Sequence, residues 1–204
     1  MVKFTASEIR DIIISMLAIS FAFALLLSRS TGFNINVIIT LMPITLIVVG
    51  FGFVFHELSH KFVAIRYGYW AEYKMWIQGL FLALITPLFG FIFAAPGAVY
   101  IHGEYISKEE NGKISVSGSI TNIIFASFFL LILIALPNNG YITILAFYGV
   151  FINGFLAFFN QLPFFGLDGS KVIKWNPFVW ILVVIVSLGF TAIGYFPDLL
   201  SLIL

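Results

Sequence analysis

The sequence contains no cysteine and few charged residues. The absence of cysteine excludes disulfide bonds, cysteine-ligated zinc sites and thiol catalysis. Charged residues make up 9% of the 204 residues, and the net charge is +1. Because no cluster of basic residues is present, nothing in the sequence indicates nucleic-acid binding. So low a content of charge lies outside the range of ordinary soluble domains.

Apolar residues dominate instead. They make up 61% of the chain, and the mean hydropathy is +1.10. With roughly 20 residues needed for each transmembrane helix, the chain has room for about five or six spans. We therefore expect one integral-membrane domain over residues 1–204, mainly α-helical, folded as a multi-pass helical bundle in a lipid bilayer. The expected spans lie near residues 9–28, 36–66, 117–136, 141–160 and 178–197.

A different pattern follows the second expected span, over residues 70–106. Polar and apolar residues alternate with a period of two from Glu72 to Gln78, and residues 98–102 form a second strand-like stretch. Together they predict a short membrane-associated β-hairpin. The segment between them, 80–95, is apolar but contains proline and glycine. It is either a further span or a loop that enters and leaves the membrane on one side.

The distribution of lysine and arginine favours the second possibility. If residues 80–95 do not cross, nine of the ten basic residues share one side and Arg29 lies on the other. If they cross, the division becomes five to five. Because basic residues gather on the cytoplasmic side, we expect a re-entrant segment, a cytoplasmic N-terminus and a site that opens to the cytoplasm from the cell membrane.

A group of ionisable residues, His56-Glu57-Leu58-Ser59-His60, follows the uncharged segment 37–55. On a helix, residues four apart lie one turn above another, so both imidazoles face the same side. Two neutral imidazoles in this H-E-x-x-H arrangement can bind Zn²⁺, and Glu57 is placed to take a proton from a water molecule that the metal activates. Ionisable residues at membrane depth are costly, which indicates a functional site.

Such a zinc site needs a third protein ligand, and Asp168 is the main candidate. It follows the apolar stretch 151–165, where the fourth expected span reaches the same side of the membrane as the H-E-x-x-H motif. Asp-Gly is also a common turn pair, so position alone leaves a plain turn residue equally open. The other candidates for the third ligand are weaker, because each is expected in solvent, at the membrane interface or on the opposite side of the membrane. They are Asp11, Glu72, His102, Glu104, Glu109, Glu110 and Asp198.

Two segments together resemble the site-2 protease family of intramembrane zinc metalloproteases. HELSH at residues 56–60 matches the family's H-E-x-x-H, and NQLPFFGLDG at residues 160–169 matches its N-x-x-P-x-x-x-L-D-G. Residues 112–122 resemble a third conserved segment more loosely. The resemblance covers the central part of the chain, and the pair of motifs is far more specific than either motif alone.

The resemblance implies that His56, His60 and Asp168 are zinc ligands and that Glu57 is the general base and acid. It implies that Asn160 orients the substrate or stabilises developing oxyanion charge. It also implies that the hairpin accepts an unwound substrate segment as an added strand. The implied activity is a zinc endopeptidase that hydrolyses peptide bonds within or near transmembrane segments of other membrane proteins.

Two positions depart from the family pattern. Phe165-Gly166 stands where a second proline is common, and Ser170 stands where a second glycine is common. Neither change removes a proposed zinc ligand, so the departures concern substrate handling rather than metal binding.

Three other kinds of membrane protein share some of these features. A different membrane metalloprotease class would take its third ligand from an E-x-x-x-D helix, a pattern that does not occur downstream. A metal transporter would need polar ligands on several spans, which here are nearly free of carboxylates. A non-catalytic zinc-binding membrane protein that binds transmembrane helices remains an open alternative. The expected partner is a membrane protein with a transmembrane helix, and nothing indicates an oligomeric state.

Overall fold

The computed structural model describes residues 3–93, 95–164 and 166–195, which are mainly helical with one small sheet. The long helices are α1 (Ala6–Ser28), α3 (Phe51–Arg66), α5 (Lys108–Ala135), α6 (Tyr141–Asn160) and α8 (Pro177–Tyr195). The shorter helices are α2 (Ile35–Thr45), α4 (Ile77–Ile85) and α7 (Gly169–Trp175), with 3₁₀ turns at Arg29–Thr31 and Thr86–Phe89. The strands are β1 (Trp70–Met75) and β2 (Gly97–His102).

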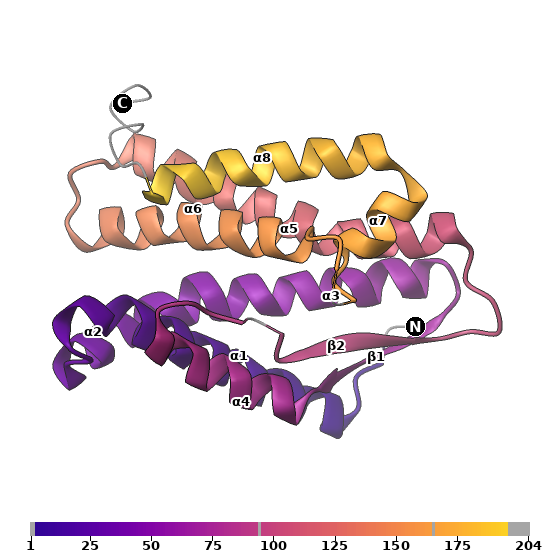
Figure 1. Ribbon diagram of the computed structural model, residues 1–204, viewed down its shortest axis with the longest axis horizontal. Coiled ribbons are helices and arrows are strands. Elements are labelled where there is room, and N and C mark those ends of the chain that lie inside the picture. Colours follow the sequence, from indigo (N-terminus) through magenta and orange to yellow (C-terminus); the bar gives the residue numbers. More distant parts are fainter. Residues whose placement is uncertain (1–2, 94, 165, 196–204) are drawn as a thin grey trace.

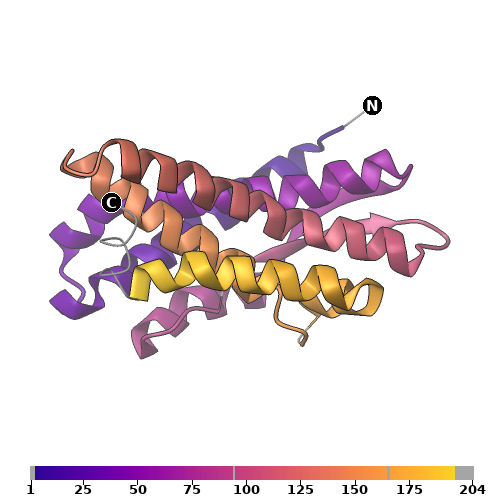
Figure 2. The ribbon, with the colours of Figure 1, turned by 90° about the horizontal axis from the view of Figure 1, so that it is seen from above.

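The helices form two layers that meet along α3 (Figure 1). One layer contains α1, α2, α4 and the strands, and the other contains α5, α6 and α8; α3 packs against α5 across the boundary. Figure 2 shows the molecule from above, with the same long helices running along its length. The core between the layers is apolar, with Val48, Val150 and Ile152 fully buried. His56, Glu57 and His60 lie on α3, at this same boundary.

Within the described part of the chain, five helical segments are long and apolar enough to cross a membrane, which confirms the expected multi-pass helical bundle. Large apolar side chains such as Ile39, Leu131 and Ile185 are more than half exposed, as a lipid-facing surface requires. The last expected span ends at residue 197, and its residues 196–197 lie outside the described part of the chain. The five segments are Ala6–Thr31, Ile35–Arg66, Lys108–Ala135, Tyr141–Asn160 and Pro177–Gly194.

Two of these segments differ from the expected spans. The third begins at Lys108 rather than near residue 117, because Ser107 and Glu110 form a capping box that starts α5 in the polar connection. The second is not one regular helix. It consists of α2, with Pro43 inside it, a π-helical turn (Leu46–Gly50) and then α3. A π turn changes the helical hydrogen-bonding pattern, so its backbone carbonyls can accept hydrogen bonds from side chains of other helices.

The predicted hairpin is present, with β1 and β2 antiparallel from Trp70 opposite His102 to Met75 opposite Gly97. The strand expected to run to Gln78 was wrong at its end, because α4 begins at Ile77. The ladder stops where the Trp76 N–H donates to the Pro96 carbonyl at 2.8 Å. Proline has no N–H to donate in return, so the pairing cannot continue in the regular pattern.

The segment 70–106 leaves α3 and returns to α5 at the same end of the molecule (Figure 1). Its apolar helical part, Ile77–Phe89, is shorter than the five long segments. The N-terminus, the end of α3, the start of α5 and α7 all lie at this end, whereas Arg29 follows α1 at the other. The arrangement therefore matches the nine-to-one division of basic residues.

Candidate metal centre

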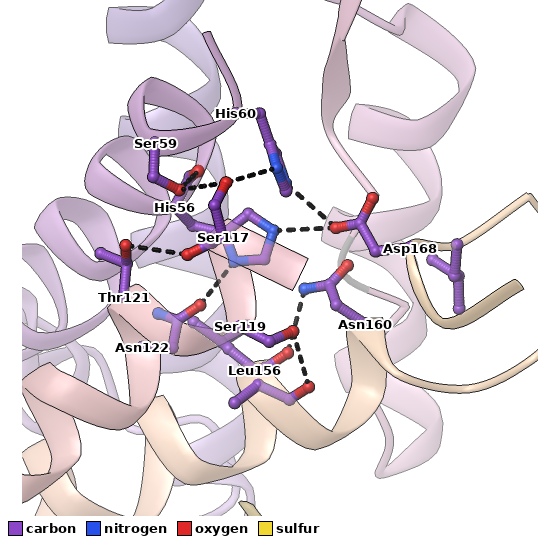
Figure 3. Close-up of polar contacts among 12 residues, drawn as sticks. His56, Ser59, His60, Ser117, Ser119, Thr121, Asn122, Leu156, Asn160 and Asp168 are labelled. Atoms are coloured by element: carbon purple, nitrogen blue, oxygen red, sulfur yellow. Dashed lines mark hydrogen bonds and ion pairs between the residues drawn. The ribbon is translucent and has the colours of Figure 1, made fainter. Parts of the chain in front are cut away.

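His56, His60 and Asp168 come together between α3 and the start of α7 (Figure 3). Asp168 Oδ2 lies 3.0 Å from His60 Nε2 and 3.4 Å from His56 Nε2. Ligand atoms bound to one tetrahedral zinc at about 2 Å lie about 3.3 Å apart, so both distances suit ligands of a single zinc ion. All three ligand atoms lie within 4.8 Å of one another. Among the described residues, they form the one group of three or more such side chains positioned to bind a metal ion.

Each imidazole makes a second hydrogen bond through its other nitrogen. His60 Nδ1 donates to the Ile114 carbonyl at 2.8 Å, and His56 Nδ1 lies 2.6 Å from Asn122 Oδ1. Both partners lie on α5. A proton on Nδ1 leaves Nε2 with a free lone pair directed at Asp168, which is the protonation state that a metal-ligating histidine needs.

The orientation of Asn122 is determined by a second buried amide, Asn153 on α6. Asn153 Nδ2 donates to the Val48 carbonyl in the π turn at 3.1 Å and to the Gly149 carbonyl at 3.0 Å. Its Oδ1 must therefore be the acceptor for Asn122 Nδ2, at 3.0 Å. Asn122 Oδ1 is left to accept from His56. Two backbone carbonyls thus determine the tautomer of a metal ligand through two amides.

We expect Asn153→Ala to weaken zinc binding about 10- to 100-fold, because it removes the residue that orients Asn122, the hydrogen-bond partner of the ligand His56. The measurement is zinc affinity by chelator competition. Ser127→Ala is a matched control, because the Ser127 hydroxyl donates within its own helix to Ile123. Equal zinc affinity in the two variants would contradict this role of Asn153.

Close packing brings the histidines against α5. A methyl group at Gly118 would lie 2.5 Å from His56 Nε2 and 2.6 Å from His60 Cε1, so this position accepts no side chain without displacing a ligand. Gly118 belongs to the loosely matching segment 112–122. Its contact with both histidines explains why this position in the segment requires a glycine.

The loop that carries Asp168 is held from three sides. The Asp168 carbonyl accepts hydrogen bonds from Lys171 and Val172 at the start of α7. Gln161, at the other end of the loop, donates through side-chain Nε2 to Ser119 Oγ at 2.8 Å, and its backbone carbonyl accepts from the Trp180 indole N–H at 2.7 Å. The third ligand is therefore placed by contacts with α5 and α8 rather than by the local turn alone.

Charge at Asp168 suits metal binding. Burial by itself would raise the pKa of Asp168, but the His60 and His56 imidazoles in their protonated, metal-free form and the charge of Lys171 hold it well below its usual range. Lys171 Nζ lies 3.5 Å from Asp168 Oδ1, the oxygen that is not directed at the histidines. The side chain is thus a carboxylate anion, the form that binds a divalent cation.

A cavity of about 240 Å³ opens beside the three ligands. Glu57 lines it and is 8% exposed, and Asn160 lines it next to Asp168 (Figure 3). Asn160 Nδ2 donates to the Leu156 carbonyl of its own helix at 3.0 Å, which leaves a second N–H on the same nitrogen. The opposite wall is formed by residues 95–101, including most of β2.

The structure brings all five predicted site residues to one place and leaves the weaker candidates outside it, except Asp198, which lies outside the described residues. Sequence reasoning missed Asn153 and Lys171. An asparagine in the apolar helix α6 was an available signal for the first. Lys171 entered the sequence analysis only as one of the nine basic residues assigned to one side of the membrane.

Comparison with known proteins gives one informative relative. The chain is 44% identical over 194 residues to a protein of Methanocaldococcus jannaschii named "Putative zinc metalloprotease MJ0611". The alignment covers 95% of this chain and 94% of that protein. No family model matches the chain, and no solved structure matches it.

Proposed function

This chain belongs to the zinc metalloprotease family of its archaeal relative, and we propose that it is an intramembrane endopeptidase of the site-2 protease type. The observation that carries the proposal is the position of the metal ligands. Two of them and Glu57 lie on a helix of a segment long and apolar enough to cross a membrane, beside a cavity. Peptide hydrolysis at such a site acts on a chain that is itself in the membrane.

The donor set fits a catalytic zinc site. Two imidazoles and one carboxylate leave one tetrahedral position for water or substrate, whereas structural zinc sites have four protein ligands. When bound, zinc supplies Lewis acidity that polarises the peptide carbonyl and makes water more acidic. His56, His60 and Asp168 hold the metal, and Lys171 balances the outer oxygen of Asp168.

Glu57 is the proposed proton carrier. Its carboxylate takes a proton from the attacking water and passes it to the departing amine, so that a C–O bond forms while the peptide C–N bond breaks. Asn160 lines the same cavity, where its remaining N–H can donate to the carbonyl oxygen as negative charge develops. In this scheme Glu57 moves the proton and Asn160 orients the carbonyl.

The edge of β2 that faces away from β1 is the proposed substrate-binding surface. The Tyr73 and Met75 N–H groups point away from β2, toward α1. Because pairing alternates in an antiparallel ladder, their partners Val99 and Gly97 direct their own N–H and C=O groups away from β1. These residues line the cavity, so an extended substrate segment can add there as a third strand.

A substrate helix must unwind before it can pair in this way, because its carbonyls are engaged in helical hydrogen bonds. We expect two adjacent glycines in the span of a single-span substrate to increase cleavage by about tenfold or more, since each glycine weakens a helix by about 1 kcal/mol. The measurement is cleavage in proteoliposomes. The control substrate carries the same glycines outside its span. Failure to cut any helix-weakened substrate would contradict the proposal.

The proposed setting is a cell membrane, with the N-terminus and the opening of the site in the cytoplasm. The gathering of basic residues at one end supports this orientation. Because the chain has no cysteine, single cysteines introduced at exposed positions can report it. We expect Asn138→Cys to react with an impermeant maleimide on intact cells and Lys108→Cys to react only after permeabilisation. The opposite pattern would reverse the orientation.

A non-catalytic zinc-binding protein that recognises transmembrane helices is the second candidate. The buried position of Glu57 beside the metal ligands favours catalysis, because a pure binding site has no need of an ionisable group there. Cleavage of a membrane substrate by the zinc-loaded protein separates the two candidates, because only the endopeptidase hydrolyses peptide bonds.

A further inference from the structure

Helix α1 turns three polar side chains toward strand β1. Glu8, Asp11 and Ser15 lie three and four residues apart, so they share one helix face. They are 1%, 8% and 0% exposed. Buried carboxylates are rare in an apolar helix and need partners, so this face has a specific contact to make.

The partners are the outward-facing groups of β1. The Tyr73 N–H donates to Glu8 Oε1 at 3.0 Å, and the Met75 N–H donates to Asp11 Oδ2 at 3.3 Å. The Tyr73 hydroxyl donates to Ser15 Oγ at 2.8 Å. These are the N–H groups that a further strand would need for pairing at this edge. Side chains of α1 therefore occupy the outer edge of the hairpin.

Glu8 also connects the strand to the metal-binding helix. Lys61 follows the ligand His60 on α3, and its Nζ donates to Glu8 Oε1 at 2.6 Å and Oε2 at 2.5 Å. Lys61 and Glu8 are each 1% exposed, so the pair is fully buried. One carboxylate thus contacts α3 next to a proposed metal ligand and β1, the strand that pairs with the cavity-lining strand β2. The position of the hairpin relative to the metal ligands depends on this contact.

We infer that α1 closes the outer edge of β1 through Glu8 and Asp11, so that substrate adds at β2 and at a defined distance from the metal ligands. The inference rests on the proposed function and specifies how its substrate is bound. The partner is an extended apolar polypeptide segment that presents backbone N–H and C=O groups. Glu8 and Asp11 are positioning residues, because they act on the substrate through the ladder.

Disulfide trapping tests which edge binds. Lys74 on β1 and Ala98 on β2 face each other in the ladder and are both exposed, which makes them matched positions. A strand added at β2 lies about 4.8 Å from that strand and about twice as far from β1. Disulfides form when Cα atoms lie within about 7 Å. In the Glu57→Gln background, a single-cysteine substrate should therefore be trapped by Ala98→Cys and not by Lys74→Cys.

Asp11 variants test the positioning role. Glu8 is less suitable, because its removal leaves Lys61 buried without a counter-charge. Asp11→Ala should raise KM about 3- to 10-fold, the equivalent of one lost hydrogen bond, with kcat and zinc content unchanged. Asp11→Asn retains an acceptor and should restore the wild-type KM. Arg10→Ala is the control, because it removes the exposed partner of Asp11 and leaves the Met75 contact in place.

Trapping at Lys74→Cys, or at neither position, would overturn the inference, as would equal KM values for Asp11→Ala and Arg10→Ala. The proposed function fails separately, if zinc-loaded wild type cuts no substrate. Trapping in Glu57→Gln still reports the binding edge in that event, because it requires binding and no turnover.

Discussion

Replacing Glu57 with glutamine is expected to abolish peptide-bond cleavage while zinc stays bound. Glutamine has nearly the same shape, but its amide accepts no proton from water and returns none to the departing amine. General acid–base catalysis contributes about 10²- to 10⁴-fold, so kcat should fall by at least that order. Zinc content should be unchanged, because Glu57 is not among the three grouped ligands. The measurements are metal analysis and cleavage on the same preparation.

Glu109→Gln provides the matched control for Glu57→Gln. Glu109 is also a helical glutamate, but its side chain is 63% exposed and pairs with Lys113 on the surface. Exposed pairs of this kind contribute little, so stability and activity should remain close to wild type. Wild-type activity in Glu57→Gln would remove Glu57 from the mechanism. An inactive but zinc-loaded wild type would favour the non-catalytic alternative.

Replacing Asp168 with asparagine is expected to remove zinc as well as activity. The change preserves the volume of the side chain but removes the negative charge, and a neutral amide is a poor ligand for Zn²⁺. The loss of affinity should exceed the roughly 10- to 100-fold expected for an outer partner such as Asn153. The measurement is zinc affinity by chelator competition. We expect the affinity to be highest for wild type, lower for Asn153→Ala and lowest for Asp168→Asn.

The same measurement distinguishes the two kinds of defect. Asp168→Asn should lose both zinc and cleavage, whereas Glu57→Gln should lose cleavage alone. Zinc retained at wild-type affinity in Asp168→Asn would mean that the third ligand is another residue. The loop itself should stay in place in this variant, because the Gln161 contacts and the Asp168 backbone bonds do not involve the carboxylate.

Helical periodicity explains why the part of the site on α3 was predictable from the sequence. His56, Glu57 and His60 lie on one helix, and residues four apart must share a face whatever the rest of the chain does. Asp168 is different. It follows α6, far along the chain, and its approach to the histidines depends on the packing of α5, α6 and α7. Its role came from the resemblance of residues 160–169 to a known motif, and the structure supplies the spatial reason.

Three contacts that sequence reasoning did not anticipate involve backbone groups. Asn153 donates to the carbonyl of Val48, and Glu8 and Asp11 accept from strand N–H groups. Every residue carries a carbonyl and almost every residue an N–H, so such partners leave no pattern in the sequence. The end of β1 was misplaced for a related reason. Alternation continues to Gln78, but pairing stops at Pro96, which lies on the partner strand.

The position of the cut bond in the substrate tests the central claim most directly. Zinc-loaded wild type is incubated in H₂¹⁸O with a single-span substrate in proteoliposomes, and both fragments are analysed by mass spectrometry. An intramembrane zinc endopeptidase should cut within or at the border of the span and incorporate one ¹⁸O into the new carboxyl group. Cleavage confined to the soluble parts of the substrate, or no cleavage by fully zinc-loaded protein, would contradict the account.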